Sequence, residues 1–276
     1  MTIKEMFTYC SNQLSFGDCG NFEAQCIFED ILKIKKEKIH CDDSIASCED
    51  VQIIENIIKR RKMGEPLQYI LGKWDFYDLT FLVGKGVLIP RPETEFLVDI
   101  ALDYLKQKDG AIIYDLCAGT GCIGLTIAHH LPQVTVYLLE KEDAAFNYLK
   151  KNAEYLKLNN VQLLKDDLFT IDLSNLPLAD IIISNPPYIP TFEISDLQKE
   201  VLSEPISALD GGDDGLNFYR CLASRWVSKV RTDGIMAFEC GDGQSQDIVN
   251  IFDGIYKEKN ITFDFNNIDR IVTFRI

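Results

Sequence analysis

The sequence predicts an α/β protein in which a doubly wound, mostly parallel sheet with an antiparallel C-terminal hairpin follows a small all-helical region. Three observations predict this fold. Apolar residues recur at helical spacing within residues 1 to about 70. Apolar strands and amphipathic helices then alternate from residue 111 to residue 255, which is the pattern of repeated βα units. Residues 261–265 and 270–276, which a short turn joins, are typical of an antiparallel pair.

These patterns divide the chain into three parts. We expect a helical domain over residues 1–72, a β-hairpin linker over 73–90 and an α/β domain over 91–276. In the first part, Asn21 is the expected N-cap of a helix over 22–35, and a second amphipathic helix covers about 49–62. The basic residues 59–62 are either a solvated helix end or a contact with an RNA-bearing partner.

Residues 67–106 introduce the α/β region. Residues 74–77 and 79–83 predict two strands about a tight turn. A rigid Pro90-Arg91-Pro92 segment follows, and Pro92 suits the first turn of a helix that runs to about residue 106. Helix capping would explain the Glu-Thr-Glu of residues 93–95, but it would not explain why the rigid segment precedes them.

Composition excludes several classes of protein. No apolar run of the 276 residues reaches the roughly 18–20 residues of a membrane span. The first residues lack the plan of a signal peptide, so we expect a cytoplasmic protein that makes no membrane contact. The net charge of −15 argues against a protein whose main role is to bind the nucleic-acid backbone. It fits either a charge that keeps the protein soluble or a partner with a basic patch. The nine cysteines show no zinc or redox spacing, so we expect reduced thiols and no metal.

A glycine-rich turn follows the first strand of the α/β region. It comprises Cys117, Ala118, Gly119, Thr120 and Gly121. Such a turn could bind a dinucleotide or merely pack, but here the second strand also ends in an acid, Glu140, where a carboxylate accepts hydrogen bonds from ribose hydroxyls. The third strand ends near Asp167 and Leu168, which are either an adenine pocket or a plain polar turn. Together the turn and Glu140 predict a nucleoside cofactor.

The stretch Asn185-Pro186-Pro187-Tyr188 follows the apolar strand that ends at Ser184. Two prolines end the strand and hold its tip rigid, which could also be a purely structural turn. A planar nitrogen is a poor nucleophile because its lone pair is delocalised. Two acceptors, the Asn185 side-chain oxygen and the Pro186 carbonyl, would hold its N–H groups, and the Tyr188 ring would stabilise developing positive charge. The stretch resembles the active-site signature of amino-methyltransferases that act on planar nitrogens, and this resemblance implies methyl transfer with no covalent protein intermediate.

Repeated βα units that end in an antiparallel hairpin are the arrangement of class I methyltransferases, a Rossmann-like fold. The whole chain resembles the HemK/PrmC type of protein-(glutamine N5) methyltransferase. The resemblance lies in residues 64–72, 88–95, 185–189 and 208–216. Nucleic-acid methyltransferases that share Asn-Pro-Pro-Tyr lack the first two segments, so these make the resemblance specific.

The resemblance implies a reaction and its participants. The methyl group of S-adenosylmethionine passes to the glutamine of the Gly-Gly-Gln loop in class I peptide chain release factors, and S-adenosylhomocysteine is the product. It implies cofactor contacts at residues 117–121, Glu140, Leu168 and Asn185. The resemblance does not include Asp167, which is a candidate cofactor contact because a carboxylate there could accept the amine of the adenine. Asn185, Pro186 and Tyr188 would be catalytic, and residues 185–188 would hold the glutamine. The helical domain would help bind the release factor, and we expect a monomer with no direct nucleic-acid substrate.

Two other functions are compatible with parts of the sequence. An N6-adenine methyltransferase would use the same tip on a flipped base, but it would need a basic cleft, which the charge of −15 disfavours. A non-catalytic binding module that kept the fold would be expected to lose Asn185 or the glycine turn, and both are present.

Overall fold

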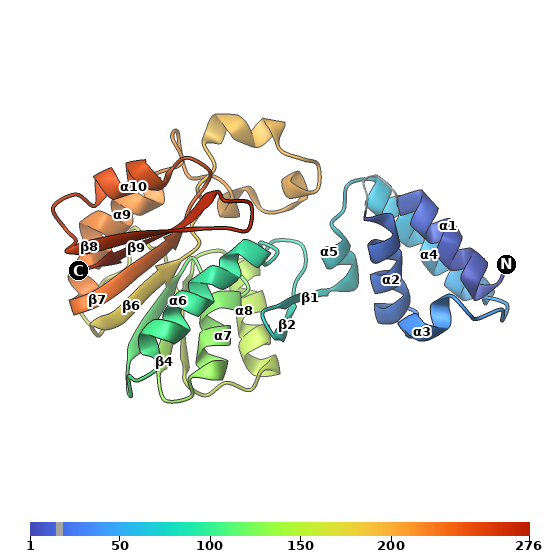
Figure 1. Cartoon of the computed structure of the whole chain (residues 1–276), viewed down its shortest axis with the longest axis horizontal. Coiled ribbons are helices and arrows are strands. Elements are labelled where there is room, and N and C mark those ends of the chain that lie inside the picture. The colour runs from blue at the N-terminus through green and yellow to red at the C-terminus, as the bar shows by residue number, and fades with distance from the viewer. Residues whose placement is uncertain (15–18) are drawn as a thin grey trace. The chain divides into compact units, whose positions relative to one another are not determined.

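A computed structural model describes residues 1–14 and 19–276 and separates them into two compact units (Figure 1). The first unit contains Met1–Lys73 together with Gln198–Ser203, and the second contains Trp74–Leu197 and Glu204–Ile276. Nothing in the sequence indicates that a six-residue segment near position 200 belongs with the N-terminal helices. Within the described part of the chain, none of the helices has the length and apolar character needed to cross a membrane.

The first unit is helical, as predicted. Its helices are α1 (Ile3–Leu14), α2 (Gly20–Asp30), α3 (Lys36–Ile39), α4 (Cys48–Lys62) and α5 (Leu67–Leu71). Helix α1 was not singled out in the sequence, although Met6, Phe7 and Cys10 line its buried face. The Phe7 ring meets the Phe28 ring edge-on at 5.3 Å between centroids, which joins α1 to α2.

The bounds predicted for α2 are wrong at both ends. Its N-cap is Cys19, so Asn21 lies inside the helix. It ends at Asp30 because Lys33 adopts a left-handed conformation with φ of 58°. The Ile34 N–H then donates back to the Phe28 carbonyl at 2.9 Å, which satisfies a carbonyl at the end of the helix. Ile34, which fits the apolar spacing of a helix over 22–35, therefore lies beyond the helix and caps its end.

The basic cluster at the end of α4 is partly buried. Ser47 and Asp50 form a capping box that fixes the start of this helix. At its end, the Arg61 side chain is only 4% exposed and donates to both carboxylate oxygens of Glu23, at 2.8 and 2.6 Å. Arg61 also pairs with Glu200 at 2.9 Å, which ties Gln198–Ser203 to the helices. The interpretation as a fully solvated helix end is therefore wrong for this residue.

The predicted hairpin consists of β1 (Lys73–Phe76) and β2 (Leu79–Leu82), and the second unit begins within β1, at Trp74. A 3-10 turn, η1 (Pro92–Thr94), then leads into α6 (Glu95–Leu105). A seven-stranded sheet follows, in the order β5-β4-β3-β6-β7-β9-β8. Strands β3 to β7 are parallel, and β9 pairs antiparallel with β7 and β8. This sheet confirms the predicted class I methyltransferase fold.

The remaining elements follow the predicted alternation of strands and helices. The strands are β3 (Ile112–Leu116), β4 (Thr135–Glu140), β5 (Val161–Lys165), β6 (Ala179–Ser184), β7 (Val230–Glu239), β8 (Glu258–Phe263) and β9 (Asp269–Arg275). The helices are α7 (Cys122–His130), α8 (Asp143–Tyr155), α9 (Asn217–Arg225) and α10 (Ser245–Ile251). The predicted loop between β6 and α9 contains three short 3-10 helices, η2 (Thr191–Asp196), η3 (Val201–Ser203) and η4 (Ile206–Ala208).

Helices cover both faces of the sheet (Figure 1). On β6, Ile181 and Ile183 pack in the core beneath α6, α7 and α8, whereas Ile182 points to the opposite core beneath α9 and α10. This alternation follows from the two-residue period of a strand. A continuous apolar run is therefore what a central strand buried on both faces requires.

The buried Arg61 predicts a stability difference within one basic cluster. Replacing Arg61 with Ala leaves the mostly buried Glu23 carboxylate without its partner and should lower the free energy of unfolding by about 2–4 kcal/mol. The matched variant Arg60→Ala breaks a pair with Glu65 in which both side chains are about a third exposed. It should cost about 0–1 kcal/mol. Urea unfolding followed by circular dichroism measures both, and equal losses would contradict the buried role of Arg61.

Candidate functional site

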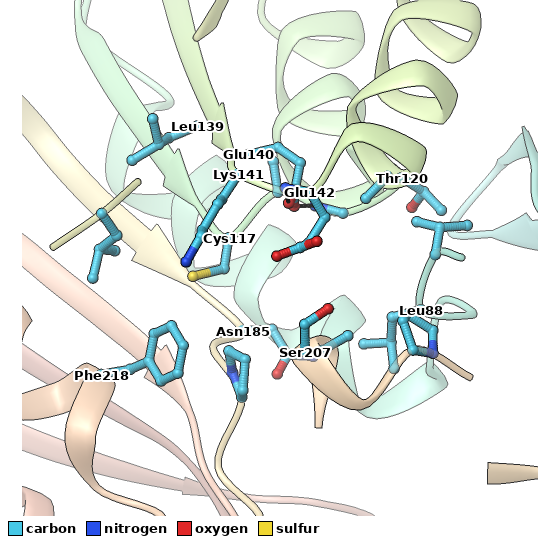
Figure 2. A pocket seen from close by; sticks show the side chains of 18 of the residues that line it. Leu88, Cys117, Thr120, Leu139, Glu140, Lys141, Glu142, Asn185, Ser207 and Phe218 are labelled. Atoms are coloured by element: carbon cyan, nitrogen blue, oxygen red, sulfur yellow. Dashed lines mark hydrogen bonds between the residues drawn. The ribbon is translucent and has the colours of Figure 1, made fainter. Parts of the chain in front are cut away.

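A cavity of about 460 Å³ opens at the carboxyl ends of the parallel strands. Strands β4 and β5 extend the sheet to one side of β3, and β6 and β7 extend it to the other. The crevice where the strand order reverses is the usual ligand site of such sheets. The cavity is large enough for a ligand of nucleoside size. In Figure 2, Glu140 and Glu142 lie on one side of it, and Asn185 and Ser207 lie across from them.

The glycine turn forms the floor of this cavity. Gly119 has φ of 57° and Gly121 has φ of 82°, a region that L side chains rarely adopt. A Cβ on Gly121 would lie 2.5 Å from the Leu149 Cδ1 atom, so this position has no room for a side chain. The buried Asn152 amide donates to the Thr120 carbonyl at 2.9 Å and also pairs with the backbone of Leu82. The turn is therefore held from behind by a side chain of α8.

Glu140 ends β4 and is only 8% exposed. Its carboxylate accepts hydrogen bonds from the Gly119 N–H at 2.8 Å and from the Glu142 N–H at 2.7 Å, one on each oxygen. Burial raises the pKa of Glu140, and these backbone donors oppose the rise. Each carboxylate oxygen has a second lone pair, so the group can still accept from the hydroxyls of a ligand.

The wall beyond β5 is built from a short loop and from α9. Asp167 pairs with Lys141 at 3.0 Å, and its second oxygen accepts from the Phe169 N–H at 2.9 Å. The Leu168 side chain is buried, and its carbonyl accepts from the Trp226 indole at 3.1 Å. The Phe169 ring meets the Phe218 ring edge-on at 5.1 Å, and both line the cavity. This wall suits a flat, apolar group with polar edges.

Asn185 follows β6 directly and joins a buried hydrogen-bond network. Its Nδ2 donates to the Thr94 hydroxyl at 3.1 Å, and that hydroxyl donates to Glu239 Oε2 at 2.6 Å. The Tyr188 hydroxyl approaches the other oxygen of the same carboxyl at 3.4 Å. Glu239 is 2% exposed, and desolvation raises its pKa to about 7. The other members of this network, Thr94, Glu239 and Tyr188, thus come from η1, β7 and the loop after β6.

The structure brings most of the sequence-predicted residues to one cavity. Its lining includes Cys117, Ala118, Gly119, Thr120, Glu140, Asp167, Leu168, Asn185 and Pro187. Gly121, Pro186 and Tyr188 are not among the lining residues, and Tyr188 instead directs its hydroxyl to Glu239. Their roles in binding and catalysis stay predictions.

Several residues at the site were not predicted from the sequence. Thr94 is the N-cap residue of α6, but its side chain makes no capping hydrogen bond and instead bonds to Asn185 and Glu239. Glu239 closes a strand far along the chain, and Phe218 lies on a helix after a long irregular segment. Only tertiary contacts reveal these residues, whereas Phe169, beside the predicted Leu168, could have been inferred. Among the described residues, no group of three or more His, Cys, Asp or Glu side chains could hold a metal ion.

The crowding behind Gly121 predicts a specific loss of stability. Gly121→Ala introduces both a positive φ for an L residue and a clash with Leu149 and Leu125. We expect it to lower the free energy of unfolding by about 2–4 kcal/mol. Gly110→Ala is the control, because Gly110 also has a positive φ but nothing within 4 Å of the new Cβ. Its cost should be about 1 kcal/mol. Differential scanning calorimetry measures the loss of stability in both variants and so separates backbone strain from the side-chain clash. Equal losses in the two variants would refute the clash.

Two family models and many solved structures match this chain. The PrmC N-terminal domain family matches residues 5–72, and the methyltransferase small domain family matches residues 94–212. The catalytic domain of hMettl16 in complex with a MAT2A 3′UTR hairpin has a TM-score of 0.59 and covers 95% of this chain and 92% of its own. At 12% identity that likeness shows the fold alone.

Two curated relatives carry the same name. A release factor glutamine methyltransferase from Thermodesulfovibrio yellowstonii is 39% identical over 232 residues, which cover 83% of this chain and 82% of the relative. The release factor glutamine methyltransferase of Clostridium botulinum is 37% identical over 281 residues, with 100% and 99% coverage. This chain belongs to the family of release factor glutamine methyltransferases.

Proposed function

We propose that this protein transfers the methyl group of S-adenosylmethionine to the side-chain amide nitrogen, N5, of the glutamine in the Gly-Gly-Gln loop of class I release factors. Membership of its family makes the chain a methyltransferase that uses S-adenosylmethionine. The observation that carries the proposal is Asn185, held at the edge of the cavity by the buried Thr94 and Glu239. We further propose that it acts as a monomer in the cytoplasm.

The cavity residues fit the cofactor. Glu140 would accept from the ribose hydroxyls, and Gly119 lets the backbone approach the ligand closely because it has no side chain. Leu168 and Phe169 would pack on the adenine, with Asp167 as an acceptor for its amine. When bound, the sulfonium of the cofactor supplies an electrophilic methyl group.

The residues of the strand tip would position the glutamine. The Asn185 Oδ1 atom and the Pro186 carbonyl would each accept one N–H of the amide. With both N–H groups held, the nitrogen lone pair can point along the line of displacement. The new N–C bond would form as the methyl–sulfur bond breaks, and the nitrogen would then lose one of its two N–H protons to solvent. The exposed Ile206 and the buried Pro187 line the same cavity, which suits a peptide loop better than a phosphate backbone.

One assay tests the proposal against methylation of an adenine base. The protein is incubated with isotope-labelled S-adenosylmethionine and either a release factor or nucleic acid, and the product is mapped by mass spectrometry. We expect label on the Gly-Gly-Gln glutamine and none on the same release factor with that glutamine replaced by Ala. Label on DNA or RNA alone would overturn the proposal.

Two substitutions should separate chemistry from cofactor binding. Asn185→Ala removes an acceptor that acts on the reacting nitrogen, so we expect kcat to fall by about 10²–10³-fold. Glu140→Ala removes charge-assisted hydrogen bonds to the cofactor and should weaken its binding by roughly 10- to 100-fold in calorimetric titration. Glu154→Ala, at an exposed site on α8, is the control for both measurements. If Asn185→Ala instead only weakened cofactor binding and left kcat unchanged at saturating cofactor, the roles assigned here would be wrong.

A further inference from the structure

The Asn185 side chain has two chemically different ends, and the proposed reaction needs one of them. Its oxygen can accept an N–H from a substrate amide, whereas its NH2 group can only donate. A 180° rotation of the amide exchanges the two ends with almost no change in shape. Something must therefore select the rotation, and the only partner that the structure gives to the Asn185 amide, among the described residues, is the Thr94 hydroxyl at 3.1 Å.

The Thr94 hydroxyl has one proton and cannot serve two acceptors. Its oxygen lies 2.6 Å from Glu239 Oε2, a distance typical of a strong hydrogen bond to a carboxylate. The proton therefore belongs to this bond whenever Glu239 is ionised. The lone pairs of Thr94 then face Asn185 and accept only from its NH2 group. This leaves the Asn185 oxygen directed away from Thr94 and available to the substrate.

We propose that Thr94 and Glu239 are positioning residues, which set the orientation of the Asn185 amide through a polarised hydrogen-bond relay. The proposal rests on the proposed function, because it assigns the relay to the same reacting amide. Neither residue touches the substrate in this role. Burial makes the relay selective, since Thr94 and Glu239 are each 2% exposed and water cannot easily replace either partner.

The environment of Glu239 makes the relay sensitive to protonation. Desolvation raises the pKa of Glu239 to about 7, Thr94, Arg270 and Tyr188 lower it, and Glu93 raises it. The Tyr219 hydroxyl, from α9, donates to the backbone carbonyl of Glu239 and leaves the carboxyl to Thr94 and Tyr188. A protonated Glu239 can donate to Thr94, which frees the Thr94 proton for Asn185. The amide is then stable in the reversed rotation, with its NH2 group toward the substrate.

Isosteric substitution tests the relay. Thr94→Val keeps the shape but removes the hydroxyl, so we expect kcat to fall roughly 10- to 100-fold while the KM for the cofactor changes by less than about threefold. Thr94→Ser restores the hydroxyl and should keep kcat within about threefold of the wild type. Thr126→Val is the matched control. Thr126 is also buried, and its hydroxyl oxygen has no partner among the described residues. Equal kcat values for Thr94→Val, Thr94→Ser and Thr126→Val would overturn the relay.

The pH profile distinguishes a relay from simple packing. For a group with pKa of about 7, the ionised fraction rises roughly tenfold between about pH 6 and about pH 8, so kcat of the wild type should rise by about the same factor. Glu239→Gln cannot titrate, and its kcat should stay level over that range. If Glu239→Gln kept the wild-type acid limb, Glu239 would not be the titrating member and the proposal would fail.

A readout without turnover separates this proposal from the proposed function. In nitrogen-15 spectra of the cofactor-free protein, the Asn185 amide signals are identified by their loss in Asn185→Ala. We expect their exchange with water to be slow in the wild type and in Thr94→Ser, and to be at least tenfold faster in Thr94→Val. Unchanged exchange in Thr94→Val would refute the relay even if release factors are methylated. Conversely, a wild type that methylates no glutamine but shows this pattern would refute only the proposed function.

Discussion

The parallel pairing of β3 with β6 is the constraint on which the site depends. Leu116 of β3 lies opposite Ser184 of β6, so the glycine turn and Asn185, which follow these residues, leave the sheet at the same level. On the other side of β6, Ser184 lies opposite Phe238, and Glu239 comes next. Because register in a sheet shifts by whole residues, a slip of one position would turn these side chains to opposite faces. The continuous apolar run of β6, buried on both faces, keeps that register.

Buried polar side chains hold the loops at the edge of this sheet. Asn152 connects the hairpin strand β2 to the glycine turn, and Glu140 binds two backbone N–H groups at the end of β4. The desolvated carboxyl of Glu239 accepts hydrogen bonds from the hydroxyls of Thr94 and Tyr188. An unpaired buried polar group is costly, so each of these side chains has few alternative arrangements. The site is therefore rigid in its supporting residues, which suits a reaction that needs alignment more than new chemistry.

Much of the fold follows from local patterns. The apolar run of β6 and the prolines after Asn185 show where a strand ends, and the βα alternation shows a parallel sheet whose carboxyl ends meet. Residues of the cavity that follow such strand ends, including Glu140 and Leu168, could be predicted for that reason. Thr94 could not, because a threonine at a helix start looks like a cap, and only the fold shows that its hydroxyl points to Glu239, which is 145 residues away in the sequence.

The sequence by itself determined the class of fold, the position of the glycine turn and the strand end before Asn185, since each depends on residues that are adjacent in the chain. The tertiary structure decided what surrounds that tip. It brought Thr94 and Glu239 to Asn185, placed the Phe169 and Phe218 rings in one wall, and buried Arg61 in a cluster that looked solvated. Such contacts join segments that are distant in the chain, and their energies come from desolvation and from hydrogen-bond geometry, which depend on three-dimensional packing and leave no local pattern.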